Sequence, residues 1–473
     1  MNSMKRMKTK LHSARLLAPL TGSICGLLVM AVVTPLGFSS RSYAEKPQAA
    51  AAASTTTRRV AEPRPGDQPT NGPQGSERTP EEALAIGLDY LLRQQHPDGG
   101  WGQGGGWRQN TRQGGGRVEG ANVEDPSDLG NTCVSLVTLL RAGQSPISGA
   151  HRQAAGKAFD YICAQVEHAD SDSLYVTDVR DTQLQVKIGT YVDTFVAGWA
   201  LSELKGKVAD DAAENRRAAA LQKVVGKIER NQREDGSFAD NKGWAAVLSQ
   251  GLASKALNSA ARSGAKVSRQ ALDKDQVQNK SGFDAKKGDF SAPTAAAEPS
   301  SAGVSLYREA AKLEGMREQS KSNVGRKTEA ESVLRSPTAP EPVKAQARKD
   351  LKAIDEDERA AQMATDGISS KLRDSRYVAG FGNNGGEEFL SYMNLTESMY
   401  AKGGKDWEDW QAKMSKTICG AQNEDGSWAG QHCITGRTFC TATALLALLV
   451  ERNAVDTRTG NVQPAPAPSV AAQ

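Results

Sequence analysis

The sequence predicts an all-α fold built from helical hairpins, each with an outer and an inner member. One observation is a corner pattern that recurs along the chain, in which an amphipathic stretch ends in Gln, turns at Gly and closes on an aromatic residue. A second is that the stretch after each corner is apolar nearly all round, as in a buried helix. The composition agrees, because 46 Gly against only 7 Trp, 9 Tyr and 9 Phe indicates short helices and tight loops.

The corners occur in four copies. Two copies are complete, one ends in Phe and one is eroded; they span Gln95–Trp101, Gln422–Trp428, Gln232–Phe238 and Gln165–Tyr175. Gly supplies a backbone conformation with positive φ, and Gln can bond backbone groups left open at a helix end. The aromatic residue is expected to pack between neighbouring helices.

The segments before the corners carry a charged face and are predicted to be outer helices: 80–95, 149–166, 210–231 and 405–419. The inner helices are predicted at 131–140, 193–201, 387–400 and 438–446. Asn131 and Asp193 are the expected N-caps of the first two inner helices, because short polar side chains bond the open N–H groups there. These elements make about five hairpins.

The corner resembles the QW repeat of the squalene-hopene cyclase, oxidosqualene cyclase and protein prenyltransferase superfamily. The resemblance covers residues 80–262 and 376–452. It implies a single α/α toroid of about five helical hairpins, with a long charged insertion that is helical or disordered.

The chain divides by composition into six parts. They are a signal peptide (1–44), a disordered leader (45–78), the first part of the toroid (79–264), an insertion (265–375), the last part of the toroid (376–455) and a disordered tail (456–473). Within the insertion, 265–300 is typical of a loop, 303–320 has an imperfect helical stripe, and 341–373 is typical of a solvated helix. We therefore expect the insertion to add surface helices or disorder.

The first segment predicts export. It has a cationic start at Lys5–Lys10, an apolar stretch at Leu20–Val33 and small residues around Ala44. The product is expected to be periplasmic or secreted, with no stable membrane span once the signal is removed. Residues 1–44 hold six cations and no acid, so their removal changes the formal charge from +4 to −2. A nearly neutral body argues against nucleic-acid binding.

Five cysteines follow the signal: Cys133, Cys163, Cys419, Cys433 and Cys440. In an oxidising compartment disulfides are possible, but an odd number leaves at least one thiol out of any intramolecular pairing. The spacing does not decide which cysteines pair.

The catalytic motifs of the superfamily are missing. No DxDD acid motif occurs, and the aromatic residues are few for a cavity that must stabilise carbocations over ring faces. The zinc-binding Asp-x-Cys spacing of the prenyltransferases is missing too, because Thr194 and Phe195 follow Asp193. Cys133 and Cys440 share a helical column with Phe195, which favours packing over metal binding. The sequence indicates no metal and no cofactor.

The candidate binding residues are those expected where the inner helices begin and where loops reach the mouth of the toroid. They are Trp101, Trp107, Asn131, Asp193, Thr194, Glu387, Glu388 and Thr438. Five of them have an obvious structural role as well: Asn131 and Asp193 as caps, Trp101 in a corner, and the two Glu residues in a first helical turn.

Two functions remain open. The sequence favours a non-catalytic binding or scaffold protein of the cell envelope, whose partner is a hydrophobic small molecule or an envelope protein. The alternative is an enzyme that acts on an isoprenoid or other hydrophobic substrate, like a terpene cyclase or prenyltransferase, through an acid that no motif reveals. A deep aromatic pocket with a lone buried acid would favour the enzyme, and a filled or shallow interior would favour the scaffold.

Overall fold

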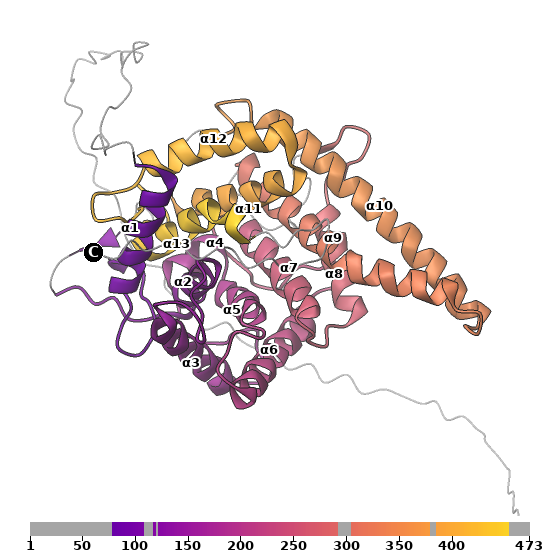
Figure 1. The fold of residues 1–473 in the computed structure, drawn as a ribbon, viewed down its shortest axis with the longest axis horizontal. Coiled ribbons are helices and arrows are strands. Elements are labelled where there is room, and N and C mark those ends of the chain that lie inside the picture. Colours follow the sequence, from indigo (N-terminus) through magenta and orange to yellow (C-terminus); the bar gives the residue numbers. More distant parts are fainter. Residues whose placement is uncertain (1–77, 108–116, 120–121, 292–303, 379–384, 454–473) are drawn as a thin grey trace, which may run out of the picture. The chain divides into compact units, whose positions relative to one another are not determined.

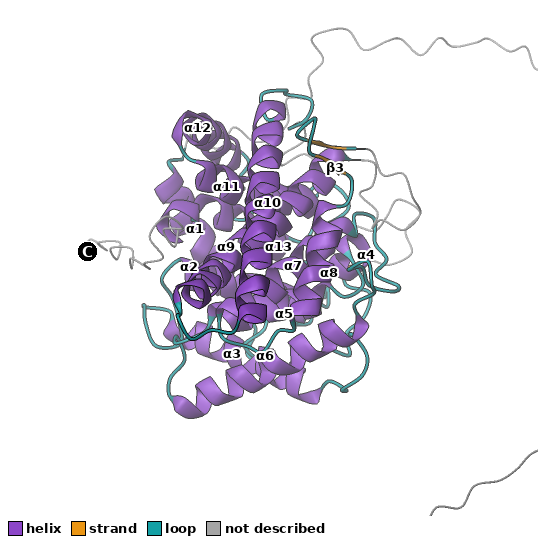
Figure 2. Ribbon diagram, turned by 90° about the vertical axis from the view of Figure 1, so that its right-hand side faces the viewer, coloured by secondary structure: helices purple, strands orange, loops and turns teal. Residues whose placement is uncertain are grey.

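The structure, a computed structural model, describes residues 78–107, 117–119, 122–291, 304–378 and 385–453. Within these ranges the chain forms thirteen α-helices, one 3₁₀ helix and two short antiparallel strand pairs (Figures 1 and 2). The prediction of an all-α fold is therefore confirmed. The predicted signal peptide and tail, and the predicted leader up to residue 77, lie outside the described residues.

Six inner helices pack side by side in a series that returns to its first member (Figure 1). In order they are α2 (Leu129–Arg141), α5 (Val192–Glu203), α7 (Val247–Arg262), α9 (Ser305–Arg335), α11 (Gly386–Lys402) and α13 (Arg437–Leu448), and α13 packs on α2. All of them are buried on nearly every side, except that α9 becomes exposed after Asn323.

Six outer helices each bury one face against an inner helix. They are α1 (Pro80–Arg93), α3 (Arg152–His168), α6 (Asp211–Asn231), α8 (Arg269–Lys280), α10 (Glu341–Lys371) and α12 (Gly404–Gly420). Their charged faces point outward, in keeping with the amphipathic pattern of their sequences.

The remaining elements are short. Helix α4 (Gln183–Ile188) precedes α5, and a 3₁₀ helix (Val450–Asn453) follows α13. Strand β1 (Gly106–Trp107) pairs with β2 (Arg117–Val118), and β3 (Phe283–Asp284) pairs with β4 (Asp289–Phe290). No described helix combines the length and the apolarity needed to cross a membrane.

The aromatic residue of each complete corner ties the corner to two helices. Trp101 and Trp428 are fully buried, and their indole N–H groups donate to the carbonyls of Leu91 (2.7 Å) and Ile418 (2.8 Å) in the preceding outer helix. The backbone N–H of each Trp donates to a threonine hydroxyl near the start of the next inner helix. Both corners therefore make the same two contacts, and in each the indole bonds a carbonyl ten residues earlier in the chain.

The Gln side chain ties the corner to a third helix. Gln95 Nε2 donates to the carbonyls of Gly99 within the corner and Ala154 in α3, both at 2.9 Å. Gln422 Nε2 repeats the second bond, to the Ala83 carbonyl of α1 at 2.9 Å. Successive outer helices are thus linked through one amide group.

The corner glycines allow close approach to the next outer helix. Gly99, Gly236 and Gly426 have φ of 89°, 81° and 89°, a region that residues with a Cβ rarely adopt. A Cβ at Gly236 would lie 2.2 Å from the Lys274 carbonyl of α8, and one at Gly426 would lie 2.6 Å from the Ile86 carbonyl of α1.

The caps of two inner helices differ from the prediction. Asp128, and not Asn131, caps α2 by accepting from the Asn131 N–H at 2.8 Å. Tyr191 precedes α5, so Asp193 lies inside the first turn of that helix. The helices begin one to three residues earlier than the apolar pattern indicated, because polar residues at their starts are buried as well.

The segment 265–375 also differs from the expectation. It contains α8 where a loop was predicted, and the first two-thirds of α9 lies buried between α7 and α11. The cause is that the buried residues are largely polar or charged, among them Asp275 of α8 and Glu314 of α9. A search for apolar periodicity passes over such a face.

We expect Gly426→Ala to lower the free energy of unfolding by about 1–3 kcal/mol, because the substitution strains the backbone and drives a methyl group into the Ile86 carbonyl. Urea unfolding measures the loss. The matched control is Gly156→Ala within α3, where nothing lies within 4 Å and a gain of about 0.5–1 kcal/mol is expected. Equal effects of the two substitutions would contradict the role of the corner.

Candidate functional site

The predicted site residues do not form one cluster, and several are bonded within the fold. Trp101 lies in its corner, the Thr194 hydroxyl donates to the Leu174 carbonyl at 2.5 Å, and the Thr438 N–H donates to the Gln103 carbonyl at 3.2 Å. The backbone of Trp107 pairs with Arg117, while its side chain is outside the part of the chain that the structure describes.

A set of amide contacts covers the N-terminal end of α13. Gln183 Oε1 accepts from the Thr435 and Gly436 N–H groups at 3.0 and 2.9 Å, and its Nε2 donates to the Thr435 hydroxyl at 3.1 Å. The Gln183 N–H in turn donates to Gln103 Oε1 at 2.7 Å. Sequence analysis missed both glutamines, because neither belongs to a motif or to an apolar stripe.

Glu387 and Glu388 lie buried in the first turn of α11. Burial raises the pKa of Glu387, although this carboxylate accepts from the Ile434 N–H at 3.3 Å. Burial, followed by the Glu387 charge, raises the pKa of the nearby Cys433 thiol to about 12. The thiol therefore remains protonated at neutral pH.

Asp193 and Asn131 do come together, in a buried group that also contains Asp128. Burial, and then the neighbouring Asp193 charge, raise the pKa of Asp128 to about 8. Burial also raises the pKa of Asp193 to about 6, against the hydrogen bond from Gln185. Asn131 Nδ2 donates to Asp128 Oδ2 at 2.8 Å, so the acids help to hold the start of α2.

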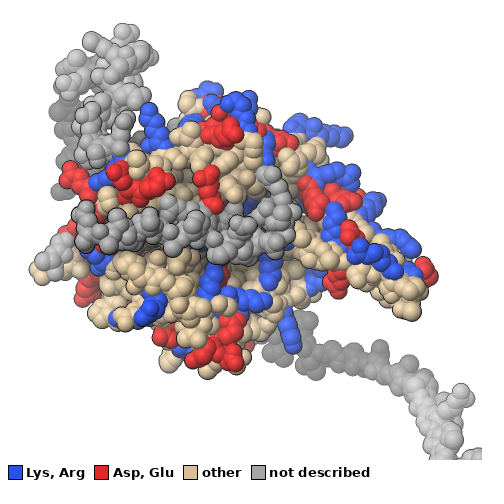
Figure 3. All heavy atoms as spheres, viewed as in Figure 1, with Lys and Arg blue, Asp and Glu red and all other residues tan. Residues whose placement is uncertain are grey.

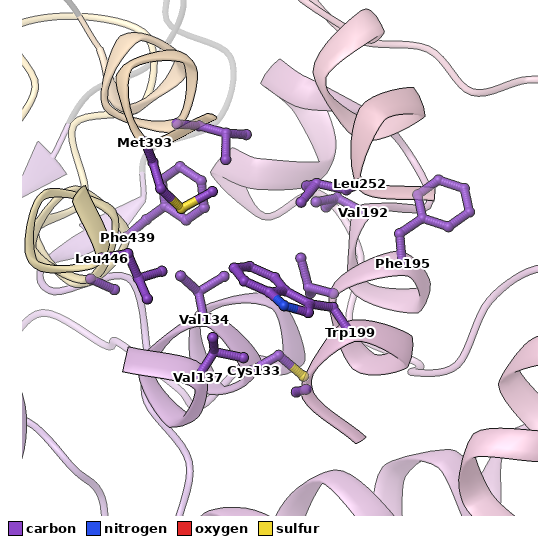
Figure 4. Packing of buried hydrophobic residues seen from close by; sticks show 14 of the residues in the cluster. Cys133, Val134, Val137, Val192, Phe195, Trp199, Leu252, Met393, Phe439 and Leu446 are labelled. Carbon is purple, nitrogen blue, oxygen red and sulfur yellow. The ribbon is translucent and has the colours of Figure 1, made fainter. Parts of the chain in front are cut away.

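Apolar side chains from several inner helices form one buried cluster, which we call the apolar layer. Figure 4 shows Trp199 extending from α5 toward Val134 of α2. Residues of this layer include Val134, Val137, Val192, Trp199, Leu252, Met393, Phe439 and Leu446, all of which are buried.

Toward the C-terminal ends, a buried ion-pair network joins four inner helices. Lys255 Nζ of α7 lies 2.7 Å from Glu314 of α9 and 2.8 Å from Glu397 of α11. Arg317 of α9 and Arg141 of α2 also pair with Glu397. Burial alone would raise the pKa of Glu397, but these three cations outweigh it and hold that pKa well below its usual range.

The network extends to α5 through Arg141. Its guanidinium lies 2.9 Å from Glu203, and the Trp199 indole N–H donates to the same carboxylate at 3.2 Å. Lys255 Nζ lies 4.5 Å from the centre of the Trp199 ring, within reach of a cation–π contact. The indole thus joins the apolar layer to the charged one.

Three carboxylates of this region lie close enough for a metal site. One oxygen each from Glu314, Glu318 and Glu397 lies within 4.8 Å of the others, and all three residues are buried. Lys255 and Arg317 lie among these oxygens, and Arg262 and Lys321 pair with Glu318, so cations balance the three carboxylates. The group is therefore explained by ion pairs, and its charge does not call for a metal.

All five described cysteines are free thiols. Cys133, Cys163, Cys419 and Cys440 are buried, whereas Cys433 is partly exposed. A hollow of about 110 Å³ lies between α1 and α12, lined by Leu84, Trp407, Met414, Ile418 and Leu448 among others. Thr396 of α11 and Ala447 of α13 also line it.

No protein-family model matches the chain, and no curated protein is significantly similar to it.

We expect Glu397→Gln to lower the free energy of unfolding by about 3–5 kcal/mol, because it leaves Lys255, Arg317 and Arg141 short of a buried counter-charge. Chemical denaturation measures the change. Glu408→Gln on the exposed face of α12 is the control, with an expected effect within about 0.5 kcal/mol. Similar losses in both variants would argue against the network.

The buried acids predict a pH dependence. Because the pKa of Asp128 rises to about 8 on folding from about 3.9 in an unfolded chain, its contribution to stability is complete below about pH 4 and is lost as the pH rises to about 8. Asp128→Asn should flatten this decline, since Asn can still cap α2. Urea titrations across this pH range compare the slopes, and identical slopes would contradict the assignment.

Proposed function

We propose that this chain is an exported protein of the cell envelope that binds or scaffolds other molecules without catalysing a reaction, and that its fold is a single α/α toroid. The observation that carries the proposal is the occupied interior. Amide contacts, an apolar layer and an ion-pair network succeed one another among the inner helices.

The toroid is supported by the closed series of inner helices and by the corners that link successive outer helices. These corners are the feature that resembles the cyclase and prenyltransferase superfamily. The arrangement has six inner and six outer helices in the described residues, one pair more than the sequence pattern suggested, because α8 and α9 supply a pair with a polar buried face.

A cyclase-like activity would need a strong acid facing a hydrophobic cavity. Among the buried carboxyls described above, Asp128 is the most similar to such an acid. A carboxyl whose pKa is near 8 is a weak proton donor, however, and this one accepts hydrogen bonds from Asn131. The aromatic rings near the centre of the helices are packed; Trp199 lies between an apolar layer and the Glu203 carboxylate. These observations favour the scaffold over the enzyme.

Export is proposed on the sequence of residues 1–44 alone. The near-neutral composition of the remaining chain agrees with a partner other than nucleic acid. The hollow between α1 and α12 is small, about 110 Å³, so we favour an envelope protein as the partner and a surface as the binding site.

Native mass spectrometry of the exported protein incubated with lipid extract tests this function. We expect the mass of the chain without residues 1–44 and no bound isoprenoid, because side chains occupy the interior. Trp199→Ala is the positive control: the lost indole should leave a cavity that takes up free indole, seen as a rise in the melting temperature. An isoprenoid retained by the unsubstituted protein would overturn the proposal.

A further inference from the structure

A buried carboxyl group without a cationic partner lies where α7, α8 and α9 meet (Figure 1). Asp275, near the middle of α8, is fully buried, and no Lys or Arg side chain of the described residues forms an ion pair with it. Glu314 of the neighbouring α9 is buried as well but has the Lys255 ammonium at 2.7 Å. On the face shown in Figure 3, Asp and Glu side chains lie at the surface among Lys and Arg side chains. A carboxylate removed from water needs a counter-charge or a proton, and Asp275 has neither from its neighbours.

The two carboxyl oxygens of Asp275 have different surroundings. Oδ2 accepts from three neutral donors, the Ser254 hydroxyl at 2.6 Å and the side-chain amides of Asn279 at 3.1 Å and Asn258 at 3.3 Å. Oδ1 is buried and accepts from no donor of the described residues. Because three donors fix the position of Oδ2, the direction in which Oδ1 points is fixed as well.

A second buried oxygen without a partner belongs to Asn258 of α7. Its Nδ2 donates to the Ser254 carbonyl at 3.0 Å and to Asp275 Oδ2. Because both partners of Nδ2 are acceptors, the orientation of the amide is settled and the remaining atom is the oxygen. Asn258 Oδ1 is buried and, within the part of the chain that the structure describes, has no donor. Two side chains that bond each other thus each keep one buried oxygen unpaired.

The side of α9 that meets α8 carries a further oxygen of this kind. A Cβ on Gly315 would lie 2.2 Å from Asn279 Oδ1, so α9 lies directly against Asn279 at this glycine. Gln319 follows one turn later on the same side of α9 and is 2% exposed. Its Nε2 donates to Asn323 Oδ1 at 3.1 Å, whereas its Oε1 has no donor among the described residues. The region where the three helices meet is therefore rich in unpaired acceptors.

The chemistry of these atoms favours a metal cation of single charge. Carboxylate and amide oxygens are the ligands that hard cations prefer, and the side chains around Asp275 Oδ1 include no thiol or imidazole for a softer metal. One carboxylate balances one positive charge, whereas a divalent ion would leave an excess positive charge in the interior.

We propose that Asp275 Oδ1 and Asn258 Oδ1 bind a sodium or potassium ion between α7 and α8. The ion supplies the counter-charge that the Asp275 carboxylate lacks, and it links an outer helix to an inner one. Ser254 and Asn279 position the carboxylate, because their donors occupy Oδ2 and leave Oδ1 to the ion. The site goes beyond the proposed function, since it lies in the interior and involves no envelope partner.

A proton is the competing occupant. Burial raises the pKa of Asp275 to about 7, although the hydrogen bonds from Ser254, Asn279 and Asn258 lower it. A protonated Oδ1 would donate to an acceptor such as Asn258 Oδ1 and would need no ion. At about pH 8 the charged carboxylate is favoured, so an ion that binds it has a measurable effect there.

Thermal unfolding of the purified full-length chain at about pH 8 tests the site. The melting temperature is compared in sodium chloride, potassium chloride and N-methylglucamine chloride, each at about 0.15 M, where the three salts screen surface charges equally. N-methylglucamine is too large for an enclosed pair of oxygens. We expect the melting temperature to be at least about 2 °C higher with sodium or potassium, and to rise with the concentration of the ion, because an ion bound only by the folded state stabilises it. The larger of the two shifts identifies the ion.

Asp275→Asn should abolish the difference between the salts, because it removes the charge and keeps the size of the side chain. Asp273→Asn is the matched control, since Asp273 lies in the same helix with its side chain 52% exposed and paired with Arg269; it should keep the whole difference. Asn258→Ala leaves the carboxylate intact and removes the second oxygen. It should raise the ion concentration that gives half of the shift at least about tenfold.

Circular dichroism checks that every variant is folded, and Asn258→Ala decides the question if Asp275→Asn is not. Equal melting temperatures of the unsubstituted protein in the three salts would overturn the proposal and assign a proton to Asp275. A sodium or potassium effect that Asp275→Asn retains in full would overturn it too. Neither result bears on the envelope function, which the experiment with lipid extract tests.

Discussion

The structure depends on the corner in which one Gln amide and one indole connect three helices. Trp428 bonds the outer helix before it and the inner helix after it, while Gln422 reaches the next outer helix. Because these groups are buried, each bond that is lost would leave an unsatisfied polar atom, which costs more than the bond contributes. The corner therefore fixes the relative position of its helices, and its repetition at Gln95 and Trp101 transmits the same arrangement to the next pair.

The packing of α7, α9 and α11 against one another determines what happens to the charges between them. When these helices pack together, they remove Lys255, Glu314 and Glu397 from water, although burial of a charged group is unfavourable by itself. A charge removed from water is tolerated only with close partners, so the cations and carboxylates must alternate in space. Lys255 has two carboxylates within 2.8 Å, and Glu397 has three cations around it. Such a network contributes to a specific arrangement more than to net stability, as hydrophobic residues of equal volume can be as stable.

Sequence reasoning worked where the signal was local. The outer helices α1, α3, α6 and α12, together with the corners at Gln95 and Gln422, follow from periodicity and turn residues. It did not work for α8 and the buried part of α9, whose inward faces include Asp275, Asn279 and Glu314. A polar residue that bonds a neighbouring helix, as Asp275 and Asn279 bond Ser254 of α7, cannot be told from a solvated one in a single sequence. In the candidate site, Glu387 and Glu388 lie at the start of an inner helix, where the sequence predicted one. The roles of Gln103 and Gln183 could not be predicted, because they depend on contacts between residues 80 and 252 positions apart in the chain.

The side chains that line the interior of a helical ring, and not the ring itself, decide whether the interior can bind a ligand. A ring of helices can bind a hydrophobic ligand in its interior only if the inward side chains leave space and carry no charge. A long charged side chain such as Lys255, where an apolar residue could stand, fails both conditions. Lys255 needs the carboxylates of Glu314 and Glu397 as partners, and Arg317 and Arg141 in turn pair with Glu397. The outside of the molecule is different, because Trp244 is 54% exposed there and the end of α9 and the start of α10 extend past the other helices.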